Sequence, residues 1–112
     1  MGEEQAEGPL FIVPPTEDAV WEALRTVDDP EVGVNVVDLG LVYGVEVHGD
    51  DVMVRVTMTS PACPLGDVIV GNANAAIRAA APGAGKIDVM LVWDPPWTPE
   101  RMSEAARERF GW

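Results

Sequence analysis

The residues with the clearest capacity for chemistry lie in one short stretch, Thr57–Pro64, which contains the only cysteine of the chain, Cys63. The stretch stands between an alternating strand pattern and a helical pattern. Pro64 suits the first position of a helix, so Cys63 is predicted to be the N-cap residue. A thiol there faces unpaired backbone N–H groups and the positive end of the helix dipole, and both favour the thiolate. We therefore expect Cys63 to be reactive, as a nucleophile or a metal ligand.

Length, composition and charge limit the kinds of protein that this chain can be. The chain has 112 residues, 47% of them hydrophobic, with 7 Lys and Arg against 19 Asp and Glu, a net charge of −12. Such a chain suits one globular domain. Its negative charge repels phosphate backbones and anionic membranes, so we expect that it binds neither nucleic acid nor a membrane. The charge instead suits binding to basic patches on other proteins, or to cations. A single cysteine excludes an internal disulfide framework and a self-contained zinc knuckle.

The chain shows one boundary and no targeting segment. Residues 1–15 are acidic and contain glycine and proline, so we expect a flexible tail there and a single domain over residues 16–112. No apolar run approaches the length of a membrane span, and no basic region followed by an apolar stretch marks a signal peptide. A cytoplasmic location is the expectation.

Apolar periodicity and capping residues indicate the elements of this domain. Thr16 is predicted to cap the first helix, and Thr98 followed by Pro99 to begin the last one. The expected elements are a helix over 16–27, an irregular buried segment over 31–40, strands over 41–47 and 52–58 joined by a turn at 48–51, a helix over 64–81, a strand over 87–93, a rigid corner over 94–97 and a helix from 98.

The order α-β-β-α-β-α predicts an α+β fold. The first two strands should pair as a hairpin, and the helix after them should be a right-handed crossover that makes the third strand parallel to the second. We expect the third strand to lie beside the first. The result would be a two-layer sandwich, a small mixed sheet with helices on one face.

Four short motifs occur in the order Asp29–Glu31, Asn35–Tyr43, Thr57–Pro64 and Val92–Trp97. Together they resemble the iron–sulfur cluster assembly domain family, in particular its short stand-alone SufT-type maturation factors. Relatives in that family include eukaryotic cytosolic cluster-targeting factors and PaaD-type proteins. The resemblance covers nearly the whole predicted domain, and four motifs in register make it specific.

This resemblance implies the fold class given above and a role in maturing iron–sulfur proteins, as a carrier or targeting adaptor rather than an enzyme. The family's cysteine corresponds to Cys63, its acidic motif residue to Asp38, and its Thr-Ser pair to Thr59 and Ser60. These residues would handle iron or an iron–sulfur cluster transiently. The implied partners are client proteins and the assembly machinery. The family also includes the N-terminal domain of some scaffold ATPases, but the chain lacks a nucleotide-binding glycine loop, so we expect that it is not a scaffold ATPase.

One thiolate cannot hold an iron–sulfur cluster, because common clusters take four ligands. Binding therefore needs a homodimer, a client protein, small thiols, or oxygen ligands such as Asp38. This aspartate lies in an apolar run, where a charge needs a partner. A turn or capping role, bonded to backbone N–H groups, is favoured over direct ligation, although both could hold. Thr59 and Ser60 are expected to satisfy the loop backbone, with support of the thiolate as the alternative.

Two other functions stay open at this point. Cys63 could serve a thiol-based enzyme or redox sensor as nucleophile or sulfenate site. It could instead be a buried structural residue in a pure protein adaptor, in which case client binding would survive Cys63→Ser. The sole histidine, His48, is expected to be an exposed turn residue. The segment Trp93–Trp97 is expected to lock the last helix, with a role as an interface anchor as the alternative.

Overall fold

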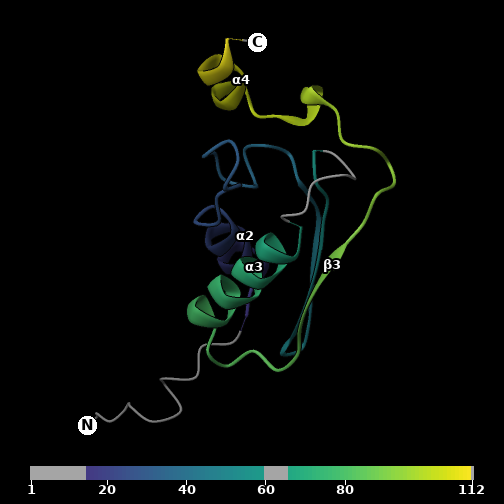
Figure 1. Ribbon diagram of the computed structural model, residues 1–112. Helices are drawn as coiled ribbons and strands as arrows, with labels where there is room; N and C mark the ends of the chain where they lie inside the picture. Colours follow the sequence, from purple (N-terminus) through teal and green to yellow (C-terminus); the bar gives the residue numbers. More distant parts are fainter. Residues whose placement is uncertain (1–14, 60–65, 112) are drawn as a thin grey trace, which may run out of the picture.

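The computed structural model describes residues 15–59 and 66–111 of the chain (Figure 1). Its order of helices and strands confirms the predicted α-β-β-α-β-α arrangement. No helix in these residues is long and apolar enough to cross a membrane. The elements are α2 (Glu17–Leu24), β1 (Val42–His48), β2 (Asp51–Val56), α3 (Gly66–Ala80), β3 (Ile87–Leu91), the 3₁₀ helix η2 (Pro99–Arg101) and α4 (Glu104–Phe110).

The sheet is mixed, and its strand order is β1-β2-β3. β1 and β2 pair antiparallel, with His48 opposite Asp51 across the hairpin turn, and Gly49 supplies the positive φ of 62° that the turn needs. β3 pairs with β2 in parallel, from Ile87 opposite Val52 to the far ends of both strands. The mixed sheet and the parallel third strand are confirmed. The predicted place of that strand beside β1 is wrong, because β3 lies beside β2.

The position of β3 beside β2 has a simple physical reason. β1 occupies only one edge of β2, so the other edge still offers a row of unpaired backbone groups. A strand–helix–strand crossover readily brings a parallel strand to that edge. The apolar pattern of a strand shows which face is buried, but it carries no information on which edge is taken.

The core lies between the sheet and two helices. Val52, Val54 and Val56 alternate along β2 and are almost completely buried. α2 and α3 pack against one another, α2 against β1 and α3 against β3, which places both helices on one face of the sheet (Figure 1). Buried residues at helical spacing, such as Ile69 and Ile77 of α3, complete this layer. The predicted two-layer sandwich is therefore confirmed for these two helices.

The first helix begins where it was predicted and ends early. The Thr16 hydroxyl accepts a hydrogen bond from the Ala19 backbone N–H at 3.1 Å, as expected of an N-cap. α2 then ends at Leu24 rather than near Val27. Val27 is nevertheless buried, so its place in the apolar pattern reflects core packing in the connection after the helix. Residues 1–14 of the predicted tail lie outside the described residues, and Pro15 is buried.

The predicted last helix is divided in two. Thr98 precedes the short η2, to which its side chain contributes no capping hydrogen bond, and Ser103 caps α4 by accepting from the Ala106 N–H at 3.1 Å. Met102 lies between them in extended conformation and is buried in the core. The helical run is therefore interrupted at this residue. α4 lies beyond the end of the sheet, over the 34–41 segment, rather than on the face covered by α2 and α3 (Figure 1).

Candidate functional site

Three of the motif segments meet at the end of the sheet where β2 and β3 finish. The Thr57 N–H donates to the Leu41 carbonyl at 2.8 Å, which joins the residues after β2 to those before β1. The Val92 N–H donates to the Val56 carbonyl at 2.7 Å and carries the chain after β3 to the same place. The fold thus brings together segments that lie far apart in the sequence, and this end of the sheet is the candidate site.

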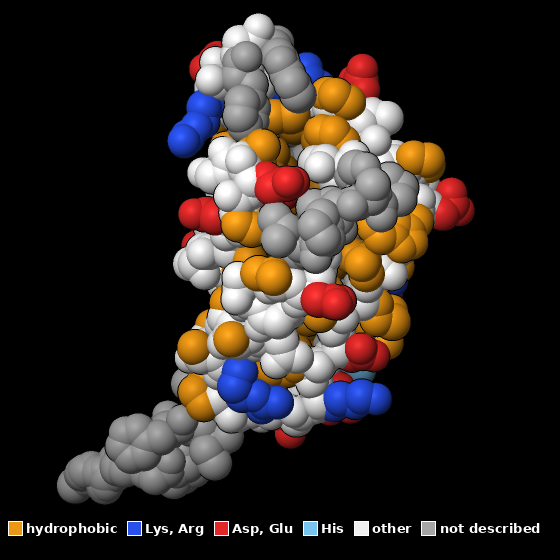
Figure 2. Space-filling view, in the orientation of Figure 1, with side chains coloured by type: hydrophobic (Ala, Val, Ile, Leu, Met, Phe, Trp, Pro, Cys, Tyr) orange, Lys and Arg blue, Asp and Glu red, His pale blue; other side chains and the backbone are white. Residues whose placement is uncertain are grey.

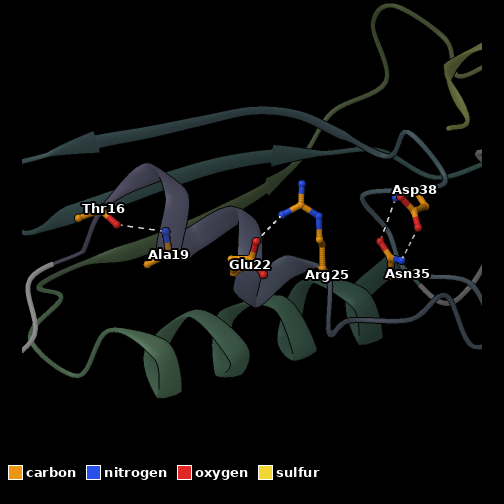
Figure 3. Close-up of polar contacts among 6 residues, drawn as sticks. All are labelled: Thr16, Ala19, Glu22, Arg25, Asn35 and Asp38. Carbon is orange, nitrogen blue, oxygen red and sulfur yellow. Dashed lines mark hydrogen bonds and ion pairs between the residues drawn. The ribbon is translucent and has the colours of Figure 1, made fainter.

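Asp38 is held there by a reciprocal pair of hydrogen bonds with Asn35 (Figure 3). The Asn35 side-chain amide donates to one Asp38 carboxylate oxygen at 2.9 Å, and the Asp38 backbone N–H donates to the Asn35 side-chain oxygen at 2.9 Å. The Asp38 carbonyl also accepts from the Ser103 N–H at 2.7 Å. A side-chain amide, rather than the predicted backbone N–H groups, is therefore the partner of the half-buried carboxylate within the described residues.

Asn35 was not predicted to have a role, although its distance from Asp38 in the sequence is a recognisable signal. Asn and Asp three residues apart in a turn commonly bond one another and the local backbone. Here the spacing closes the turn that leads toward β1, and Gly40 ends it with a φ of 75°. Asp38 is therefore positioned by its own loop, with one face left available for further contacts.

A hollow of about 300 Å³ opens beside Asp38, between the 28–38 loop and α4. Neither Asp28 nor Asp38 forms an ion pair within the described part of the chain, although the Arg109 side chain lines the same hollow. Buried Val34 and Ala106 contribute apolar surface to it. The hollow can therefore accept a polar or charged group next to the Asp38 carboxylate.

The C-terminal part of the chain is fastened across this site. The Tyr43 hydroxyl donates to the Pro95 carbonyl at 2.7 Å, and the Arg101 guanidinium lies 4.5 Å from the centroid of the Tyr43 ring. The indole N–H of Trp97 donates to the Leu39 carbonyl at 2.7 Å. This bond holds the segment that contains Trp97 against the 34–41 loop, and the predicted role of the Trp93–Trp97 segment in locking the last helix stays a prediction. Trp93 is 42% exposed.

The sequence of the chain matches a known protein family. The family described as "Iron-sulfur cluster assembly protein" matches residues 17–89 of the chain. The chain belongs to this family. The resemblance carried by the four motifs is thereby confirmed.

Relatives of similar length agree with this assignment. The chain is 41% identical over 93 residues to the "Fe-S protein maturation auxiliary factor YitW" of Bacillus subtilis, covering 82% of this chain and 90% of that protein. It is 41% identical over 84 residues to the "Fe-S protein maturation auxiliary factor SufT" of Staphylococcus aureus, covering 74% and 94%. A crystal structure of a "Domain of Unknown Function DUF59" from Bacillus anthracis is 38% identical, with a TM-score of 0.82 over 85% of this chain and 91% of that one.

The structure describes some of the expected site residues of this family member and not others. Asp38 and Thr59 are both half-buried near the end of the sheet. Ser60 and Cys63 lie outside the described residues, as does the predicted cap at Cys63, so these stay predictions. The described chain leaves the sheet at Thr59 and resumes at Gly66, which is packed against Leu91 of β3.

The described residues do not form a metal centre by themselves. In residues 15–59 and 66–111, no three His, Asp or Glu side chains lie together in a way that could hold a metal ion. Within this part of the chain, the Asn35 amide is the hydrogen-bond partner of the Asp38 carboxylate. Iron or a cluster handled by this family member would therefore need ligands from outside the described residues or from another molecule.

Proposed function

We propose that this protein is a cytoplasmic accessory factor that assembles iron–sulfur clusters or delivers them to client proteins, and that it is not an enzyme. Family membership and the names of the relatives support the general role. The observation that carries the proposal for this chain is the meeting of the 38–41, 57–59 and 92–97 segments at one end of the sheet. Thr59 and Gly66, the described residues on either side of the segment that contains Cys63, lie at this end of the sheet.

Cys63 would supply the thiolate ligand for iron or for a cluster. Thr59 and Ser60 would support it by hydrogen bonds, and Asp38, oriented by Asn35, would frame the neighbouring surface. Since a cluster takes four ligands, the remaining ligands would come from a client, an assembly protein, small thiols or the second copy in a homodimer. Shared ligation of this kind favours transient transfer over storage.

The test is anaerobic reconstitution of the protein with ferrous iron and sulfide, followed by transfer to an apo client enzyme that needs a [4Fe–4S] cluster. We expect the wild-type protein to speed client activation and Cys63→Ser to lose this effect. Ala75→Ser is the matched control, because it places the same hydroxyl on the exposed face of α3. Ala75→Ser should transfer at the wild-type rate.

The rival functions give different results in the same experiments. If the protein is an adaptor with a structural cysteine, the Cys63→Ser variant would bind clients as well as the wild-type protein does. The thiol of the native wild-type protein would then resist alkylation at every pH. A reactive thiolate would instead be alkylated at pH values well below the ordinary thiol pKa of about 8.5. Turnover of a defined substrate by Cys63, without iron, would instead establish a thiol enzyme.

A further inference from the structure

The outer face of α2 borders a hollow of about 600 Å³ that no part of the proposed site explains. Asp18, Trp21, Glu22 and Arg25 line it, at the helical spacing that places them on one face. Val37, the residue before Asp38, closes its other side. The hollow therefore combines an aromatic side chain with carboxylates and adjoins the candidate site.

The charges in this hollow are only partly balanced. Arg25 pairs with Glu22 at 2.9 Å, and Figure 3 shows this pair on the last turns of α2, with the Asn35–Asp38 pair in the loop beyond. Asp18 forms no ion pair with any residue that the structure describes. One free carboxylate thus lies beside the indole of Trp21, which is half-buried against the core. An indole side chain next to carboxylates favours a cation.

The rest of the chain cannot readily supply that cation. Of the chain's 7 basic residues, most are engaged elsewhere: Arg55 with Glu46, Arg78 with backbone carbonyls, Arg101 with Tyr43 and Arg107 with a backbone carbonyl. On the face drawn in Figure 2, Lys and Arg side chains gather toward the two ends, whereas Asp and Glu are spread along the molecule. The first nine residues carry three glutamates and no basic residue. A second copy, with its net charge of −12, would also be repelled.

We propose that this hollow is the docking site for a lysine- or arginine-bearing segment of a partner protein. The cationic head of the partner would lie between Asp18 and Glu22, with its aliphatic stem on Trp21 and Val37. Under the proposed function, on which the identity of the partner rests, that protein would be a client or an assembly factor. Docking against Val37 would bring it next to the Asp38 segment.

The probe is a blocked pentapeptide with two arginines separated by leucine, titrated into the full-length protein without iron or sulfide and followed by ¹H–¹⁵N NMR. We expect saturable shifts at the amides of α2, at Val37 and at the Trp21 indole. Asp18→Asn should weaken binding by about two- to five-fold, the range for one exposed charge pair. Asp50→Asn removes the same charge at the hairpin turn, outside the residues that line the hollow, and should leave the affinity unchanged.

Arg25→Gln gives a prediction of the opposite sign. It removes the cation that pairs with Glu22, so it should strengthen binding of the arginine peptide, whereas mere damage to α2 would weaken it. The proposal is overturned if a glutamine version of the peptide binds equally well, if Asp18→Asn and Asp50→Asn behave alike, or if no saturable binding occurs. Shifts at the same amides that grow with protein concentration alone would assign the hollow to a second copy. None of these results depends on cluster transfer, so the docking site and the proposed function can fail separately.

Discussion

The indole N–H of Trp97 and the backbone carbonyl of Leu39 are joined by a 2.7 Å hydrogen bond across 58 residues of sequence. Leu39 is buried, and Trp97 packs against the core from the segment that follows β3. With the Tyr43–Pro95 bond, this contact fastens the C-terminal segment over the end of the sheet where the motif segments meet. The arrangement of the candidate site therefore depends on a few long-range polar contacts.

The first prediction removes this contact. Trp97→Phe keeps an aromatic ring but leaves the buried Leu39 carbonyl without its donor, so we expect a loss of about 1–3 kcal/mol in the free energy of unfolding. Trp93→Phe is the matched control, because Trp93 is 42% exposed, and it should change stability by less than about 0.5 kcal/mol. Urea denaturation measures both. Equal effects of the two substitutions would contradict a special role for the Trp97 bond.

A second prediction concerns two glycines with nearly equal backbone angles. Gly40 has a φ of 75°, and a methyl group added there would collide with the backbone carbonyl of Arg101. Gly33 has a φ of 72° with nothing close to the added methyl. Gly33→Ala should therefore show only the conformational penalty of about 1–2 kcal/mol, and Gly40→Ala clearly more. Thermal unfolding of both variants would refute this account if their melting temperatures fell by the same amount.

The third prediction separates orientation of Asp38 from its charge. Asn35→Ala leaves the Asp38 N–H and carboxylate without their partner, so we expect a loss of about 1–2 kcal/mol in unfolding free energy. Asp38→Asn still offers an oxygen to the Asn35 amide and should stay within about 1 kcal/mol of the wild-type stability. If Asp38 only positions its loop, Asp38→Asn should also keep cluster transfer near the wild-type rate. A normal fold with lost iron binding would show instead that Asp38 is a ligand.

The fourth prediction is a pH dependence at the open face of the sheet. A hydrogen bond with His48, at 3.1 Å, and then one from Arg55, at 3.3 Å, hold the pKa of Glu46 below its ordinary value of 4.5. Because the folded-state pKa is lowered, the stabilisation is present above 4.5 and is lost as the pH falls through the folded-state value. NMR titration of the Glu46 carboxyl carbon should show its midpoint rising toward 4.5 in His48→Ala, and rising less in Arg55→Gln. A larger rise of the Glu46 pKa in Arg55→Gln than in His48→Ala would show that Arg55, and not His48, is the main cause of the lowered pKa.

Local patterns predicted the elements of this fold well, because each has a local cause. The hairpin follows from period-two alternation, and α2 begins directly after Thr16 because the Thr16 hydroxyl caps a backbone N–H. The place of β3 was wrong because the choice between two sheet edges is made by packing across the whole domain. The break at Met102 was missed although this side chain was expected on the inner face of the helix, because a buried methionine is equally compatible with a continuous helix.

The candidate site was predictable only in part. Asp38 was found from its motif, and its pairing with Asn35 could have been inferred from their spacing of three residues. The hydrogen bond from Trp97 to Leu39 could not be inferred from the sequence, because no local pattern relates residues so far apart. The hollow on α2 was also missed, since Asp18, Trp21 and Glu22 look like an ordinary amphipathic helix until Val37 is placed beside them.

The last prediction concerns a buried hydroxyl beside the site. Thr57 is 1% exposed, and its hydroxyl has no hydrogen-bond partner among the described residues, although its backbone N–H binds Leu41. Thr57→Val keeps the shape and removes the unpaired group, so we expect stability to rise by about 1 kcal/mol. Thr26→Val is the control, because the Thr26 hydroxyl donates a hydrogen bond to the Ala23 carbonyl, and its loss should lower the stability. A loss of stability in Thr57→Val would show that this hydroxyl has a partner in the folded protein in solution.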